Sequence, residues 1–192
     1  MIEVKHDIRM LQQLRQQLDP ADVNKALRWS LDAVTRKAAT AISRDIRSVY
    51  AIKASQVKQH LKIKRVERDA SRALLYTGKS LPLAQFAPKQ RVVRTTATSR
   101  RGRTFNTKRK GVTARVRKDI GRKLVKGGWH AKGRIFRRKS AADNKSQPIT
   151  QYGPSIPGMV AHPSTIDAAQ ELVRAELPKE FNSRLEYILG KK

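Results

Sequence analysis

The stretch from Asp19 to Val49, DPADVNKALRWSLDAVTRKAATAISRDIRSV, carries the clearest periodic signal in the chain. Its apolar residues recur at intervals of three or four, which lines one side of an α-helix of about seven turns. These residues are Val23, Leu27, Leu31, Val34, Ala38, Ile42, Ile46 and Val49. Asp19 is suited to cap the first turn, and Pro20 is suited to the first helical position. The stretch therefore predicts a long amphipathic helix that begins near residue 20.

Shorter helical patterns lie on both sides of this stretch. Before it, the spacing of Ile8, Leu11, Leu14 (or Arg15) and Leu18 predicts a shorter helix. After it, residues 53–61 contain good helix formers and no helix breaker. We therefore expect residues 5–60 to form a helical N-terminal part.

A second long helical pattern covers residues 164–189. Its apolar residues are Ile166, Ala169, Val173, Leu177, Phe181, Leu185 and Ile188. Ser164, followed three residues later by Asp167, forms a variant of the capping box. Pro178 lies inside the pattern. Because proline has no N–H group and its ring meets the preceding turn, we expect it to kink or split this C-terminal helix.

The middle of the chain, residues 61–152, changes to a period of two residues, which is typical of half-buried strands. The strand candidates are Leu61 to Val66, Gly111 to Arg117, Ala73 to Thr77 and Gly133 to Arg137. Together the patterns predict an α+β fold in a single domain, residues 1–192. In this fold a short-stranded central sheet is packed by the long first helix and the kinked last helix.

Positive charge is concentrated in one part of the middle. Residues 89–145 hold 21 Lys or Arg and two acidic residues, Asp119 and Asp143, so they carry +19 of the net charge of +28. Such a density repels itself in a compact monomer, and phosphates or acidic protein surfaces would neutralise it in the working state. Because residues 94–110 have no apolar rhythm, we expect a long, mobile basic loop there.

This basic loop supplies the candidate contact residues. They are Arg100, Arg101, Arg103, Lys108, Arg109 and Lys110. Six phosphate contacts would give a slope of log affinity on log salt of about −5, at about 0.9 per phosphate. Readout of bases is not expected, because aromatic residues make up only 5% of the chain and no zinc finger or compact helix-turn-helix pattern is present. A DNA backbone and acidic patches on partner subunits fit the loop equally well.

The sequence predicts no catalytic, metal or cofactor site. It has no cysteine, and its four histidines fall in different predicted elements. These histidines are His6, His60, His130 and His162. No apolar run approaches the ~20 residues that cross a bilayer, and residues 1–7 lack the apolar core of a signal peptide. We expect a protein that is not an enzyme, needs no cofactor, folds in a cytoplasm and does not enter a membrane.

Seven short motifs follow one another along nearly the whole chain. They are Ala26 to Leu31, Tyr50 to Lys53, Leu81 to Phe86, Gly111 to Val116, Ile135 to Arg138, Tyr152 to Val160 and Glu176 to Phe181. Each motif alone has little specificity, and their order and spacing carry the signal. In that order they resemble the minor tail protein Z family of long-tailed phages.

The resemblance implies a structural virion protein of a tailed phage. It implies a tail-completion or neck protein at the head-proximal end of the tail, with a role in tail assembly and in head-tail joining. The implied partners are copies of the same chain in a ring, expected to be a hexamer, the tail tube, the tail terminator and the head connector, all around the DNA channel. The implied location is the virion, after assembly in the cytoplasm of the host bacterium.

Two alternatives to a virion protein stay open. A pI of about 11.3, a basic extension and a small α+β body also suit an RNA-binding protein associated with the ribosome. A tail-length or assembly factor that is absent from the finished particle is the other alternative.

Overall fold

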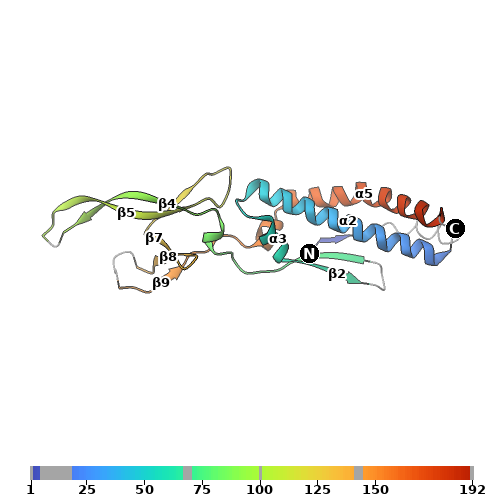
Figure 1. Ribbon diagram of the computed structural model, residues 1–192, viewed down its shortest axis with the longest axis horizontal. Helices are drawn as coiled ribbons and strands as arrows, with labels where there is room; N and C mark the ends of the chain where they lie inside the picture. Colours follow the sequence, from blue (N-terminus) through green and yellow to red (C-terminus); the bar gives the residue numbers. More distant parts are fainter. Residues whose placement is uncertain (1, 5–18, 67–70, 100, 141–144, 191–192) are drawn as a thin grey trace. The chain divides into compact units, whose positions relative to one another are not determined.

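The computed structural model describes residues 2–4, 19–66, 71–99, 101–140 and 145–190. It combines helices with antiparallel sheets, which confirms the predicted α+β class (Figure 1). The helices are α2 (Pro20–Val49), α3 (Ala54–Gln59), α4 (Ile156–Val160) and α5 (Pro163–Leu189), with a 3-10 turn η1 (Leu83–Gln85). The strands are β1 (Ile2–Val4), β2 (Leu61–Val66), β3 (Ser71–Tyr76), β4 (Lys89–Thr98), β5 (Thr104–Ala114), β6 (Lys123–Val125), β7 (Gly128–Ala131), β8 (Arg134–Arg138) and β9 (Pro148–Thr150).

Contacts within the chain divide it into two compact units. The helical unit comprises residues 1–46, 54–78 and 156–192, and the strand unit comprises residues 47–53 and 79–155. Two compact units can still unfold in one cooperative transition, as a single domain does, or in two separate transitions. The single domain expected from the sequence therefore stays a prediction.

The long first helix is confirmed as α2. The Asp19 carboxylate accepts a hydrogen bond from the Ala21 N–H at 2.9 Å, and the Asp19 carbonyl accepts one from the Val23 N–H at 3.2 Å. Seven residues of the predicted apolar stripe are buried, and Val49 is half-buried. Burial of this stripe, at about 25 cal/mol per Å² of apolar surface, is what stabilises a helix of this length in water.

The helical unit also holds a three-stranded antiparallel sheet, in the order β1-β3-β2. The patterns at residues 61–66 and 73–77 correspond to β2 and β3, and α3 corresponds to the predicted helix after α2. The strand β1 was not predicted. The helix expected around Ile8 to Leu18 lies outside the described residues, so the helical prediction for residues 5–60 is tested only beyond residue 18.

Asp32 of α2 holds two arginines of the sheet. The Arg72 Nε on β3 lies 2.6 Å from Asp32 Oδ1, and the Arg65 Nη2 on β2 lies 3.5 Å from Asp32 Oδ2. Arg72 is only 5% exposed and also donates to the Ser71 carbonyl. A buried guanidinium is tolerated when a carboxylate and further acceptors satisfy it. Asp32 is therefore the residue that allows β3 to bring an arginine under α2.

The C-terminal helix is confirmed as α5, but its start is not the predicted one. The N-cap residue is His162, since Pro163 takes the first helical position, to which its fixed φ is suited. The predicted cap, Ser164, instead forms a hydrogen bond with the His162 ring at 2.8 Å. Pro178 lies inside α5 and does not split it. The apolar residues buried along α5 include six of the predicted seven, and Ile166 is half-buried.

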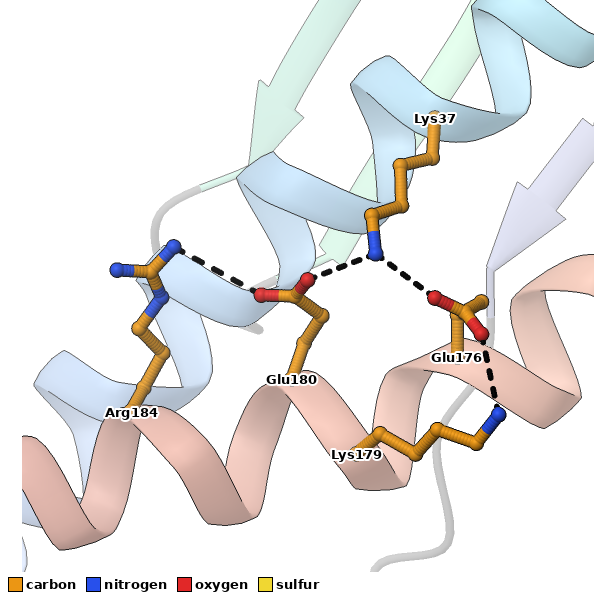
Figure 2. A network of polar contacts seen from close by, with 5 residues as sticks. All are labelled: Lys37, Glu176, Lys179, Glu180 and Arg184. Carbon is orange, nitrogen blue, oxygen red and sulfur yellow. Dashed lines mark hydrogen bonds and ion pairs between the residues drawn. The ribbon is translucent and has the colours of Figure 1, made fainter.

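An ion-pair network joins α2 to α5 (Figure 2). The Lys37 Nζ on α2 lies 2.7 Å from a Glu176 oxygen and 2.8 Å from a Glu180 oxygen. On α5, Lys179 contacts Glu176 at 3.2 Å and Arg184 contacts Glu180 at 3.7 Å. The hydrogen bond from Lys37 lowers the pKa of Glu176, and the bond to Glu176 raises the pKa of Lys37. Each shift favours the charged form of the group.

We expect Lys37→Met to lower the Tm only in the pH range in which Lys37 and Glu176 are both charged. Since the pKa of Glu176 lies below its ordinary 4.5 in the folded state, the stabilisation is lost as the pH falls through that lowered pKa. Since the pKa of Lys37 lies above 10.5, the stabilisation is lost as the pH rises through that raised pKa. The difference in Tm between wild type and variant should be largest between these limits. Lys58→Met, at an exposed position of α3, serves as the control, and a Lys37→Met difference that does not change below pH 4.5 contradicts the prediction.

The strand unit holds two further three-stranded antiparallel sheets, β4-β5-β6 and β7-β8-β9. In the described residues, three separate three-stranded sheets thus stand in place of the predicted central sheet, and most of their strands pair with neighbours in sequence. The pattern at residues 133–137 corresponds to β8. The pattern at residues 111–117 stays in a strand only to Ala114, and beyond it the Arg115 N–H donates to the Phe86 carbonyl.

Phe86 is the largest fully buried side chain among the residues that the structure describes. It follows η1 and lies against Gly153, where an added Cβ would come 2.6 Å from the Phe86 ring. The chain beside it is held by the Gly153 N–H, which donates to the Leu81 carbonyl at 2.8 Å. Glycine at 153 therefore lets the backbone approach an aromatic ring that a larger residue would displace.

Candidate functional site

The predicted basic loop is a long β-hairpin. Strands β4 and β5 pair antiparallel along the whole of β4, from Lys89 opposite Thr113 to Thr98 opposite Thr104. At the tip, the Ser99 N–H donates to the Arg103 carbonyl at 2.8 Å, and the Gly102 N–H donates to the Ser99 carbonyl at 3.0 Å. Gly102 has a φ of +77°, which glycine adopts without strain. Residues 94–99 and 101–110 thus belong to a hairpin in place of the predicted loop.

The local sequence explains why a strand pair forms without an apolar rhythm. Val92 and Val93 are β-branched, and so are the threonines that recur along both strands, all of which favour the extended backbone. Those threonines are Thr95, Thr96, Thr98, Thr104 and Thr107. The antiparallel ladder satisfies the backbone N–H and C=O groups that β4 and β5 turn toward each other, even where neither face is buried. An argument based on burial alone does not detect such a hairpin.

The structure separates the predicted contact residues. Arg101 and Arg103 lie at the tip of the hairpin, whereas Lys108, Arg109 and Lys110 lie on β5, and all five are exposed. The sixth, Arg100, lies outside the described residues. Because side chains alternate along a strand, Lys108 and Lys110 lie on one face of the hairpin and Arg109 lies on the other.

The strand pairing brings together residues that are distant in sequence. Arg94 on β4 lies directly opposite Lys108, and Val92 lies directly opposite Lys110. Directly paired residues share a face, so Arg94, Lys108 and Lys110 form one cluster. We call their face the Lys108 face and the opposite one the Arg109 face. Sequence analysis missed Arg94, and the signal that identifies it is the turn at Gly102, which sets the register.

The opposite, Arg109 face is partly covered. Val93, which pairs with Arg109, is half-buried, and Thr113 at the base is buried. A Cβ added at Gly111 would lie 2.6 Å from Val93 and 3.4 Å from Leu124 of β6. Both faces are covered at the base, because Val112 on the Lys108 face is buried in the core of the strand unit. Beyond the base, the described positions of the Lys108 face are exposed from Val92 to Lys110.

The charges of the two units differ strongly. The strand unit holds 24 Lys or Arg and two Asp, a net charge of +22, whereas the helical unit holds 19 Lys or Arg and 13 Asp or Glu, a net charge of +6. Asp119 is the acidic residue of the strand unit that the structure describes, and it forms an ion pair with Arg117 at 2.8 Å. The hydrogen bond from Arg117 lowers the pKa of Asp119. The described part of the strand unit therefore offers the cations of the hairpin no further carboxylate.

The described residues offer neither a metal site nor a membrane span. Within the described ranges, no group of three or more His, Asp or Glu is placed to hold a metal ion. In the same part of the chain, neither α2, α5 nor a shorter helix combines the length and apolar character that a membrane span requires.

A family model described as prophage minor tail protein Z (GPZ) matches residues 4–191. None of the curated proteins and none of the solved structures matches the chain. The family match covers nearly the whole sequence, including both units and the hairpin. It is the family whose motif order the sequence resembles. The chain therefore belongs to the prophage minor tail protein Z family and is a structural component of a phage tail.

Proposed function

We propose that this chain is the tail-completion or neck protein at the head-proximal end of the tail, where it takes part in tail assembly and in joining the head to the tail. The observation that carries this proposal is the net charge of +22 on the strand unit, whose described carboxylate is already paired. A charge of this size needs a polyanion close by in the assembled particle. In a phage tail, the channel through which DNA passes is the place where a polyanion comes close to the protein.

In this proposal, six copies form a ring around the channel, between the tail tube with its terminator and the head connector. Copies that each carry +28 repel one another at close range. DNA in the channel offsets this repulsion, because duplex DNA carries one negative charge per about 1.7 Å of its axis. Acidic patches on neighbouring subunits are a second source of negative charge.

The helical unit suits contacts between proteins. Its net charge is only +6, and α2 and α5 expose Trp29, Tyr187 and Leu189 to solvent. Exposed aromatic side chains are enriched at protein interfaces, where they contribute most of the binding energy. We therefore assign ring contacts to the helical unit and polyanion contacts to the strand unit. Assembly takes place in the cytoplasm of the host bacterium, and the ring remains in the virion.

The position of the protein in the particle tests the proposal. We expect a phage that lacks this gene to produce DNA-filled heads and separate tails in negative-stain images, and we expect the gene supplied on a plasmid to restore joined particles. A gold label on an affinity-tagged chain should lie at the head-proximal end of the tail. A label along the tube or at the distal tip contradicts the proposal.

Two further outcomes identify the alternatives. If mass spectrometry of purified virions contains no peptide of this chain, the protein is an assembly factor that leaves the finished particle. If the chain co-purifies with ribosomal RNA after a moderate salt wash and no virion contains it, the protein is an RNA-binding protein. The expected result is peptides of the chain in every virion preparation.

A further inference from the structure

We propose that the Lys108 face of the β4–β5 hairpin binds the phosphate backbone of duplex DNA, with Arg94, Lys108 and Lys110 as its central contacts. This inference rests on the proposed position beside the DNA channel. It names duplex DNA, and not an acidic protein surface, as the partner of the hairpin. It assigns no role to Arg109 in the same contact, although Arg109 lies between Lys108 and Lys110 in the sequence.

The strand register places like charges together. Arg94 and Lys108 are direct cross-strand partners, so their Cβ atoms lie about 4.5–5.5 Å apart. Lys110 follows on the same face of β5, about 7 Å along the strand from Lys108. Like charges directly opposite one another destabilise a strand pair. An anion bound between these side chains turns their repulsion into attraction, so the pairing fits an occupied site.

The exposed polar side chains of this face can all donate hydrogen bonds to phosphate oxygens. The face is exposed at Gln90, Arg94, Thr96, Thr98, Thr104, Asn106, Lys108 and Lys110, each of which has a hydrogen-bond donor. No carboxylate lies among them. Lysine, arginine, threonine, asparagine and glutamine are the side chains that contact the phosphates of DNA most often. The face therefore offers a donor at almost every position along about ten residues of strand.

The same composition argues against an acidic protein partner. Stable protein interfaces have a desolvated centre with aromatic or other large apolar anchors. On the Lys108 face, Val112 at the base is buried and Val92 is the exposed apolar side chain, and no aromatic residue of β4 or β5 belongs to this face. The exposed aromatic residue of the hairpin, Phe105, belongs to the Arg109 face. A polyanion recognised by charge and hydrogen bonds alone is the better match.

Two matched triple variants of the full chain test the face assignment. The first, Arg94→Gln with Lys108→Gln and Lys110→Gln, removes three charges from the Lys108 face. The second, Lys89→Gln with Arg91→Gln and Arg109→Gln, removes three charges from the same strands on the Arg109 face. The two variants have the same net charge, so a difference between them cannot come from net charge. Circular dichroism spectra that match the wild type confirm that each variant is folded.

Binding to a short DNA duplex of mixed sequence is followed by fluorescence anisotropy between about 50 and 200 mM salt. We expect the first variant to have a slope of log affinity on log salt that is shallower by about 2.7, because each lost phosphate contact removes about 0.9. We expect the second variant to keep a slope close to that of the wild type. Equal slopes for the two variants, or an unchanged slope for the first, overturn the assignment.

Poly-glutamate of similar chain length is the second probe. We expect it to bind more weakly than the duplex and to show the same affinity for both triple variants. If it binds as tightly as DNA and loses affinity only with the first variant, the Lys108 face is a site for acidic protein and the DNA assignment is wrong. The gold-label experiment on virions is independent of both readouts. A label away from the neck removes the proposed function, whereas the slopes decide the inference alone.

Discussion

Asp32→Ala should lower the free energy of unfolding by about 3–5 kcal/mol, because it leaves the buried Arg72 guanidinium without its carboxylate. The loss of the Arg65 contact adds little, since Arg65 is exposed and its nitrogen lies 3.5 Å from the carboxylate. The effect is measured as the change in urea midpoint at constant m-value.

Removing both charges separates the cost of an unpaired ion from the value of the pair. We expect Asp32→Ala combined with Arg72→Met to be more stable than Asp32→Ala alone, because no buried charge then remains. Asp119→Ala is the matched control, since it breaks the exposed pair with Arg117 and should change stability very little. A loss for Asp32→Ala no larger than that for Asp119→Ala shows that Arg72 does not depend on Asp32.

Phe86→Ala should destabilise the strand unit by about 3–5 kcal/mol, because it empties the site of a fully buried ring and leaves a cavity against Gly153. Phe105→Ala is the control with the same change of side chain at a position that is 49% exposed, and we expect it to lie within about 0.5 kcal/mol of the wild type. Equal stability of the two variants contradicts the assignment of Phe86 to the core.

The two tryptophans allow both losses to be assigned to a unit. Trp29 belongs to the helical unit and lies near Lys25, whereas Trp129 belongs to the strand unit and stacks on Phe136 with a centroid distance of 6.1 Å. Variants with one tryptophan replaced by phenylalanine report on one unit each. If Asp32→Ala shifts only the Trp29 transition and Phe86→Ala only the Trp129 transition, the chain holds two domains. A common shift supports the single domain expected from the sequence.

The helices could be predicted because burial determines them. The stripe from Val23 to Ile46 and the repeat from Ala169 to Ile188 are apolar at helical spacing, and both are buried as expected. The start of α5 was harder to predict. Serine is a common N-cap residue, which favours an N-cap at Ser164, whereas the fixed φ of Pro163 favours a start at Pro163 itself. The sequence alone does not show which of these two preferences is stronger.

The hairpin could not be predicted from burial, because its strands are polar on the exposed face and are held by the backbone ladder. Its composition did contain a usable signal, namely the threonines around Gly102. The candidate site has the same limit. Lys108, Arg109 and Lys110 are contiguous in sequence and were treated as one group, but a strand places them on two faces. Arg94 joins Lys108 only through a register that is set by the turn.

The outer strand of the hairpin also bears on how free subunits avoid one another. Strand β4 is an edge strand, so along its ten residues it presents unpaired backbone groups to which an edge of a second copy could add. Such edges are templates for aggregation, and charged side chains are the usual protection against it. Lys89, Arg91 and Arg94 provide that protection on β4. The charges of β4 thus protect newly made chains from edge-to-edge pairing before assembly, and one of them, Arg94, is also a contact in the proposed DNA site.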